Sequence, residues 1–398
     1  MTKTHDVLIV GGGLVGASLA IALDRLGLEV GLVEATPAGV MPAVFDQRNL
    51  SFAGATVNAL TTLGVMAKLR APTGPIRRIH VSRQGDFGRA RLQAADYGRD
   101  AFGQVVVARD FGEALEARLS ELQGLIRYRP ARFIGLGESR EGSRSLRISD
   151  GQGERELSAR LLVAADGTRS GLREALGIGV SEHDYRQTLF VARMRAEQAP
   201  DGTAYERFGE NGPTALLPRG DRHFGVVHGV ASEQTEEVAA LTAAGWIERI
   251  QNVFGWRVGR FLSTGERSAY PIVKVVAERT VAARAVLLGN AAQTIHPIGA
   301  QGFNLGLRDA LTLAELIGQA EDPGASVLLD RYAERRREDR QRTLEFSDGL
   351  ARITGNASPM MRPLRSLGLM AADNSAALQS MLVGGAMGLR GDVPELCR

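Results

Sequence analysis

The sequence is poor in cysteine and lysine. Cys397 is the only cysteine among 398 residues, which excludes a disulfide framework, a cysteine-ligated metal and the paired cysteines of a disulfide reductase. So little cysteine is compatible with a reducing compartment. With only three lysines, nearly all positive charge belongs to arginines, which are interleaved with acidic residues. This distribution indicates no nucleic-acid partner.

Long apolar runs are also missing. Ala285–Leu307 carries no charged side chain, but it contains amides, a histidine and a proline. Asn374–Leu389 is uncharged and shorter than the roughly 20 residues that cross a bilayer. The N-terminus lacks the cleavage-site pattern of a secretory signal. We expect a cytoplasmic protein that can lie peripherally on the inner face of the membrane.

The remaining composition is typical of a globular protein. Hydrophobic residues make up 44% and charged residues 23% of the chain, the net charge is +3, and the length suits two domains. The six histidines show neither H-x-x-x-H nor H-E-x-x-H spacing, so we expect no metal site.

A strand–helix–strand unit is predicted at the N-terminus. Asp6–Val10 has the pattern of a short buried strand, Leu14–Leu26 that of an apolar helix, and Leu28–Glu34 that of a second strand. Such a unit of about thirty residues predicts two parallel strands joined by a right-handed crossover. Further on, Glu236–Val253 predicts one helix within a strand-rich region.

The loop between the first strand and its helix carries a dinucleotide-binding pattern. Gly11, Gly13 and Gly16 form G-x-G-x-x-G, in which glycines permit a tight turn, close approach to a pyrophosphate and helix–strand packing. Glu34 ends the second strand, where an acid accepts hydrogen bonds from ribose hydroxyls. The alternative is a plain glycine-rich turn. An acid disfavours a 2′-phosphate, so FAD or NAD is favoured over NADP.

Two later strands also lead into polar turns. Leu161–Ala165 precedes Asp166, and Ala285–Leu288 precedes Gly289–Gln293. Open α/β sheets bind ligands at such strand ends. Taken alone, each turn is equally compatible with an ordinary connection, but three in one chain favour a ligand site.

Together these loops resemble a known family. The D-G-x-x-S-x-x-R run from Asp166 to Arg173 and the run G-N-A-A-Q-T-I-H-P-I-x-x-Q-G-F-N-L-G-x-R-D from Gly289 to Asp309 are similar to those of the flavoprotein aromatic hydroxylases of the p-hydroxybenzoate hydroxylase type. The late run is most similar to that of the ubiquinone-biosynthesis subgroup, and within it to the 2-polyprenyl-6-methoxyphenol hydroxylases. Three further matches to this subgroup are Asp46-x-Arg48, Phe254–Arg257 and Tyr270-Pro271.

The resemblance implies one FAD, held by all three loops. Its pyrophosphate would contact Gly11, Gly13 and Gly16, and its adenosine ribose Glu34. Asp166 would have a buried structural role linked to NAD(P)H.

The flavin end would be bound by the late run. Asn290 would face the ribityl chain, and Pro297, with the turn of Gly299, Gln301 and Gly302, would border the isoalloxazine; Asn304 completes this group. Arg48 and Arg109 match positions near the flavin and its phosphates, with a surface salt bridge as the alternative for Arg48. Candidate catalytic residues are Pro297, His296 and Arg48.

Two positions depart from the family pattern. Asn290 replaces the usual acid, which keeps hydrogen bonding to a hydroxyl but removes a negative charge. Gly299-Ala300 inverts the expected Ala-Gly order before Gln301. The backbone N–H groups of this turn should face the flavin, so the inversion bears on the geometry of the turn and on the flavin potential.

The fold class expected is mixed α/β. A Rossmann-like, glutathione-reductase-like FAD domain would comprise residues 1–75, 101–179 and 276–350. A mostly antiparallel substrate sheet of 76–100 and 180–275 would be inserted into it, and 351–398 would form a helical C-terminus. Within the last segment, Met360–Leu389 predicts an interfacial helix pair or, equally, helices that pack against protein.

The implied reaction is hydroxylation of a polyprenylated phenol in ubiquinone biosynthesis, with NAD(P)H as transient co-substrate and O2 activated as a flavin C4a-hydroperoxide. The phenol, with a pKa of about 10, needs activation, but the sequence assigns no residue to this task. Alternatives are a flavin monooxygenase for another aromatic substrate, or a catalytically weak flavin-binding scaffold that associates with other ubiquinone-biosynthesis proteins.

Overall fold

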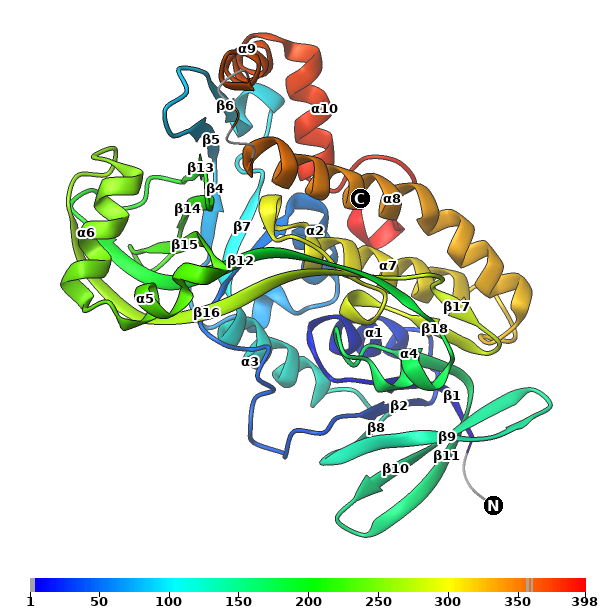
Figure 1. The fold of residues 1–398 in the computed structure, drawn as a ribbon. Coiled ribbons are helices and arrows are strands. Elements are labelled where there is room, and N and C mark those ends of the chain that lie inside the picture. Colours follow the sequence, from blue (N-terminus) through cyan, green and yellow to red (C-terminus); the bar gives the residue numbers. More distant parts are fainter. Residues whose placement is uncertain (1–3, 356–357, 359–360) are drawn as a thin grey trace.

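The computed structural model describes residues 4–355, 358 and 361–398 and contains two large sheets (Figure 1). The first has eight strands, of which five adjacent ones run parallel to one another. The order is β17 (Val281–Ala282), β18 (Ala285–Leu287), β11 (Gly153–Ala164), β1 (Thr4–Val10), β2 (Val30–Val33) and β8 (Leu125–Tyr128), with β10 (Ser143–Asp150) paired to β11 and β9 (Ala131–Arg140) to β10.

The register of this sheet brings the three glycine loops together. Val10 at the end of β1 lies beside Val33 of β2 and Ala164 of β11, and Ala164 lies beside Leu287 of β18. Because these strands are parallel, the loops that follow them leave the same edge of the sheet. Local motifs that are more than 100 residues apart in sequence are thereby assembled into one site.

The second sheet is antiparallel except for the pair β13–β5. The order is β19 (Gln293–Thr294), β16 (Phe261–Ala277), β12 (Val180–Ala196), β15 (Phe224–Ala231), β14 (Gly212–Pro218), β13 (Thr203–Gly209), β5 (Arg78–Arg83) and β6 (Arg89–Gln93). A small third sheet contains β3 (Asn49–Ala53), β7 (Gly103–Val107) and β4 (Gly74–Ile76).

Helices cover the sheets in a way that the sequence explains. Helix α1 (Leu14–Asp24) buries eight successive residues because it lies between the first sheet and α7 (Gln301–Ile317). The other helices are α2 (Gly54–Thr62), α3 (Ala108–Leu119), α4 (Gly171–Ala175), α5 (Thr235–Ala240), α6 (Ala243–Phe254), α8 (Ser326–Gly355), α9 (Met361–Asn374) and α10 (Ala376–Ala386). In Figure 1, α5 and α6 cover one face of the second sheet, and α9 and α10 stand beside β5 and β6.

The predicted helix over Glu236–Val253 is wrong as a single element, because the chain breaks between α5 and α6. Leu241 leaves the helical conformation. The Thr242 side chain then accepts a hydrogen bond from the N–H of Gly245, and this N-cap starts α6. The amphipathic α6 then packs Trp246, Ile250 and Phe254 on the second sheet.

The mixed α/β fold with a mostly antiparallel second sheet and C-terminal helices agrees with the sequence prediction. The division into domains stays a prediction, and residues 1–3 of its first segment lie outside the described residues. So does Met360, at which the predicted helix pair begins. Among the residues that the structure describes, no helix is both long and apolar enough to span a membrane.

Candidate active site

A cavity of about 1390 Å³ lies between the two large sheets and the C-terminal helices. This volume exceeds the roughly 300–1,000 Å³ of a typical small-ligand pocket. The predicted site residues that line it are Gly11, Gly13, Glu34, Arg48, Asp166, Asn290, Pro297, Gly299, Gln301 and Gly302. The predicted residues Gly16, Arg109, His296 and Asn304 are not part of its wall.

The first glycine loop has two glycines that the fold itself requires. Gly11 has a φ of +107°, and a Cβ there would lie 2.3 Å from the carbonyl oxygen of Ala165. A Cβ on Gly16 would lie 2.0 Å from the carbonyl oxygen of Gly11, so this glycine permits the close packing of α1 on the strand ends. Gly16 thus acts from behind the cavity wall.

Gly13 is different, because its lack of a side chain is not needed for packing. A Cβ there would meet only Val44 Cγ1, at 3.8 Å, and its φ of −71° suits any residue. Gly13 is the N-cap of α1 and lines the cavity, so the N–H groups of the first helical turn point to a surface suited to an anion.

Gly13→Ala is therefore expected to separate ligand binding from folding. We expect the free energy of unfolding of the ligand-free protein to fall by no more than about 1 kcal/mol, because alanine is a poorer N-cap than glycine. Dinucleotide affinity should fall about 10- to 100-fold from the clash with a pyrophosphate. Fluorescence titration with the cofactor and urea unfolding would measure the two effects. Gly151→Ala, at a glycine with open space around it, is the matched control; equal affinities of the two variants would contradict the assignment.

Glu34 is oriented by backbone donors. Its Oε2 accepts from the N–H of Gly12 at 2.8 Å and its Oε1 from the N–H of Thr36 at 2.7 Å. Each carboxylate oxygen keeps a further lone pair, which suits the hydroxyls of a ribose. Glu34 thus lies at the end of the second strand, as predicted, and these two hydrogen bonds fix the orientation of its carboxylate.

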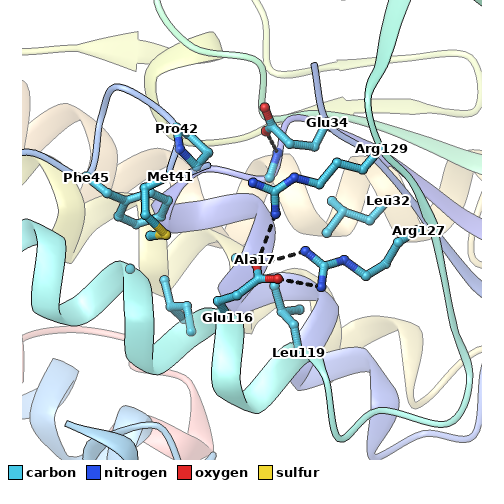
Figure 2. A pocket seen from close by; sticks show the side chains of 13 residues that line it. Ala17, Leu32, Glu34, Met41, Pro42, Phe45, Glu116, Leu119, Arg127 and Arg129 are labelled. Atoms are coloured by element: carbon cyan, nitrogen blue, oxygen red, sulfur yellow. Dashed lines mark hydrogen bonds and ion pairs between the residues drawn. The ribbon is translucent and has the colours of Figure 1, made fainter. Parts of the chain in front are cut away.

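An ion-pair group supports the loop beyond Glu34. Figure 2 shows Arg127 and Arg129 reaching toward Glu116 of α3, beside the small pocket that Glu34 also lines. Arg127 donates to both carboxylate oxygens of Glu116, at 2.7 and 2.8 Å, and Arg129 donates to the carbonyl oxygen of Thr36 at 2.7 Å. This group fixes the chain that follows Glu34.

The second loop is connected to the third through the D-G-x-x-S-x-x-R run. Asp166 accepts hydrogen bonds from the Ser170 hydroxyl and from the N–H of Leu172 in the first turn of α4. Arg173 donates to the carbonyl oxygens of Thr168 and Ala291, each at 3.0 Å. Asp166 is half-buried rather than buried as predicted, and its carboxylate organises the loop.

The inverted Gly299-Ala300 order is accommodated by two left-handed residues in succession. Gly299 has a φ of +71° and Ala300 one of +52°, which costs an alanine about 1–2 kcal/mol. Asn304 holds the turn: its amide donates to the carbonyl oxygens of Ala300, at 2.7 Å, and Ser51, at 2.9 Å. Its own oxygen accepts from Ala53 and Thr56, so its side chain supports the turn from behind.

Comparison with known proteins identifies the family of this site. The sequence profile of the FAD binding domain family matches residues 4–347. The chain belongs to the FAD-binding domain family. Ubiquinone hydroxylase UbiL of Rhodospirillum rubrum is 34% identical over 409 residues, covering 100% of this chain and 93% of that protein. The 3-demethoxyubiquinol 3-hydroxylase of Escherichia coli is 29% identical, covering 96% of this chain and 98% of that protein.

Solved structures share the fold. That of p-nitrophenol 4-monooxygenase PnpA from Pseudomonas putida has a TM-score of 0.79 at 19% identity, covering 98% of this chain and 99% of that one. The resemblance to flavoprotein hydroxylases of the ubiquinone subgroup is thus confirmed, and with it FAD as cofactor and the class of FAD-dependent monooxygenase. The closer likeness to 2-polyprenyl-6-methoxyphenol hydroxylases and the roles of single residues stay predictions.

The residues present fit FAD. Gly13 and the start of α1 offer donors to a pyrophosphate, and Glu34 offers acceptors to a ribose. The Asn290 side chain is exposed at the cavity and has no hydrogen bond to another described residue, so its amide is available to a ribityl hydroxyl. The replacement of an acid by Asn290 therefore leaves the site complete.

Arg48 lies in the wall of the FAD cavity and is fixed there. Its guanidinium donates to both oxygens of Asp46, at 2.7 to 3.0 Å, and lies 4.3 Å from the ring centroid of Tyr270, whose hydroxyl donates to Asp46 at 2.6 Å. Burial acts to raise the pKa of Asp46, but the hydrogen bonds from Arg48 and Tyr270 outweigh it and lower that pKa. Arg48 thus forms a salt bridge with Asp46, as in the alternative considered for it, but the pair lies at the cavity and not on the outer surface.

Arg109 is exposed at the start of α3 and does not line the cavity.

His296 supports the flavin turn from inside the protein. Its Nδ1 accepts from the N–H of Ile298, so Nε2 carries the proton and donates to Gln187 at 3.2 Å. Burial lowers the pKa of His296 to about 4, which keeps the ring neutral. The side chain is buried outside the cavity wall, in a place that suits a structural role better than the predicted catalytic one.

This burial predicts a pH dependence of stability. Between about pH 6.5 and pH 4 the unfolded chain protonates His296 while the native protein does not, so stability falls as pH drops through this window. The full effect is roughly 3 kcal/mol. Urea unfolding at about pH 7 and about pH 5 should show a smaller pH effect in His296→Asn than in the wild type; equal pH effects would contradict this account.

Beyond the turn of Pro297–Gly302 the cavity wall is mostly apolar. The sequence predicted a substrate sheet here but named none of the apolar residues that line it. Apolar lining residues of the second sheet are Ile79, Val81, Leu92, Leu189, Val191, Ala204, Phe208, Ala215, Leu217 and Val227, and those of the C-terminal helices include Phe346, Leu350, Leu364, Leu369 and Leu382. The signal available in the sequence was alternation, as in Ala204-x-Glu206-x-Phe208, where every second residue of β13 faces the cavity.

Proposed function

We propose that this protein uses FAD, NAD(P)H and O2 to hydroxylate the aromatic ring of a polyprenylated phenol in ubiquinone biosynthesis. The observation that carries the proposal is a single cavity that runs from the cofactor loops to an apolar wall. Relatives that align with nearly the whole chain are named ubiquinone hydroxylases, which supports a phenolic precursor of ubiquinone as the substrate.

When bound in this cavity, FAD would supply the redox chemistry between NAD(P)H and oxygen. The protein binds, orients and excludes water. The turn of Pro297–Gly302 would border the flavin ring, and Arg48 places a fixed positive charge in the same wall. The apolar strands beyond the turn hold the phenol and keep water from the reacting atoms.

The apolar wall is also suited to a prenyl chain. It continues from the sheet to α9, where Leu364 and Leu369 line the cavity. A hydrocarbon tail in this region loses contact with water, at about 25 cal/mol for each Å² buried. Substrates with longer tails are thus expected to bind more tightly until the apolar wall is filled.

The test is catalysis by the holoenzyme. FAD-loaded protein is mixed with NADH or NADPH and ortho-dimethylallyl phenol under isotopically labelled oxygen, and product is analysed by mass spectrometry. Cofactor oxidation that depends on the phenol, with one labelled oxygen in the product, is the expected result. FAD binding without any labelled product from prenyl phenols would overturn the proposal and favour a flavin-binding scaffold that acts with other ubiquinone-biosynthesis proteins.

Membrane contact through α9 and α10 is the second part of the proposal, and it places the protein peripherally on the inner face of the membrane. Leu364, Leu367, Met370 and Met381 are exposed on these helices, and the same helices line the cavity. A substrate dissolved in the bilayer would then enter without crossing water.

Vesicle flotation tests this contact. We expect the FAD-loaded protein to float with vesicles of phosphatidylglycerol and phosphatidylethanolamine, and the variant Leu367→Asp to remain at the bottom of the gradient. Val327→Asp, at an even more exposed apolar residue at the start of α8, is the control and should float. Equal flotation of both variants would exclude α9 as the membrane contact.

A further inference from the structure

One ionisable side chain of the apolar wall has no role in the site described so far. Glu206 lies in the middle of β13 and lines the cavity. Its cross-strand neighbours are Ala215 of β14 and Val81 of β5, which line the cavity as well. Along its own strand, Ala204 and Phe208 share its face, so the carboxyl group has apolar neighbours on all four sides.

The Glu206 carboxyl has no partner within the described protein. No hydrogen bond or ion pair joins it to another described residue. Burial alone raises its pKa to about 7, well above the ordinary value of a glutamate. An unpaired carboxyl in apolar surroundings costs folding free energy, and such groups are frequent at functional sites.

On the opposite face of β13 the side chains contact α6, so the unpaired carboxyl of Glu206 is a feature of the cavity side alone. Tyr205 packs its ring against Phe254 of α6, and Arg207 donates to the carbonyl oxygen of Val253 at 2.9 Å. On that face the charged group of Arg207 is thus paired with α6, whereas Glu206 faces the space in which the substrate is proposed to bind.

We propose that Glu206 is the catalytic residue that binds the hydroxyl group of the phenol and accepts its proton. This inference rests on the proposed function. The O–H bond of the phenol breaks, an O–H bond forms at a carboxylate oxygen of Glu206, and the electron pair stays on the phenol oxygen. The ring thereby becomes electron-rich without a change in the total charge of the pocket, and the proton returns to the product oxygen after hydroxylation.

Glu206 is the only carboxylate on the apolar part of the described cavity wall that could accept a proton from the phenol. From the neighbouring elements, Arg83 of β5 and Arg365 of α9 line the same cavity, and both lie within 3.5 Å of Asp86, which is fully buried. The other charged residues in the described wall belong to the cofactor end: Glu34, Arg48, Arg132 and Asp166. β14 and α8 contribute apolar residues only.

The test compares holoenzymes of wild type, Glu206→Gln and Glu206→Asp with ortho-dimethylallyl phenol. A missing general base typically lowers a rate by about 100-fold or more, and we expect this loss in kcat of the Gln variant with little change in KM. The Asp variant, which keeps a carboxylate, should recover part of it. Glu182→Gln, at an exposed residue of β12, is the matched control.

The pH profile separates a chemical role from a structural one. Because the base acts as a carboxylate, the wild-type rate should fall about tenfold for each pH unit below about pH 7. In Glu206→Gln this acidic limb should be absent. The flavin spectrum and thermal midpoint, measured first, establish that each variant is folded and loaded with FAD.

The outcomes keep this inference apart from the function on which it rests. If wild-type holoenzyme forms no hydroxylated phenol, the proposed function is wrong and the role of Glu206 falls with it. If the wild type forms product and Glu206→Gln is equally fast with an unchanged pH profile, only the assignment of Glu206 is wrong.

Discussion

Gly16→Ala is expected to abolish FAD binding and to destabilise the protein itself. The added Cβ would lie 2.0 Å from the carbonyl oxygen of Gly11 and 3.2 Å from Cβ of Ala165. Backbone cannot yield as a flexible side chain can, so α1 must move away from the strand ends that form the cofactor loops. We expect a loss of about 3 kcal/mol in the free energy of unfolding, measured by urea titration without added FAD, and a colourless purified protein.

Gly13→Ala is the sharpest comparison for this variant, since it should lose affinity with little loss of stability. Gly151→Ala, in the open turn between β10 and β11, should lose neither. A Gly16→Ala protein that retains FAD and unfolds like the wild type would show that α1 does not need its close approach to the sheet.

Asp309→Asn is expected to have the second large effect, although Asp309 does not touch the cavity. Its Oδ1 accepts from Nε of Arg336 at 2.7 Å and its Oδ2 from the amide of Gln293 at 2.8 Å, with the side chains of both ion-pair partners 3% exposed. An asparagine in this place turns an N–H₂ group toward a donor and removes a charge opposite a buried guanidinium. Breaking a buried ion pair from one side costs about 3–5 kcal/mol.

Urea unfolding of the FAD-loaded protein would measure this loss. Because Gln293 ends the third cofactor loop, we also expect weaker FAD binding in this variant. Asp330→Asn, at an exposed carboxylate on α8, should change stability by less than about 0.5 kcal/mol. A loss of similar size in both variants would show that the buried pair has no special importance.

The cofactor end of the site was predictable because its motifs are local. Gly11, Glu34 and Asn290 each follow a strand, and parallel strands deliver their following loops to one edge, so short sequence patterns specify a shared location. The pattern also led to Asn304 and His296, but it could not show that their side chains are used behind the turn. A sequence motif does not distinguish the residues that contact the ligand from those that support a neighbouring residue.

The substrate end was not predictable in the same way. Glu206 is unusual only because Val81 and Ala215 flank it on other strands, and the parallel pairing of β13 with β5 joins segments more than 100 residues apart. The break between α5 and α6 likewise depends on a local competition, in which Thr242 caps a new helix in preference to continuing the old one. Such features depend on the pairing of distant strands and on helix capping, which cannot be predicted from hydrophobic periodicity.

The shared cavity links stability to the supply of cofactor. Its walls come from both large sheets and from the C-terminal helices, so ligands bound in it would contact parts of the chain that unfolding would separate. A ligand that binds only the native state adds about 1.4 kcal/mol for each tenfold increase of its free concentration above Kd. The thermal midpoint of this protein is therefore a property of the solution as much as of the chain, and in a cell short of flavin the same sequence would be degraded sooner.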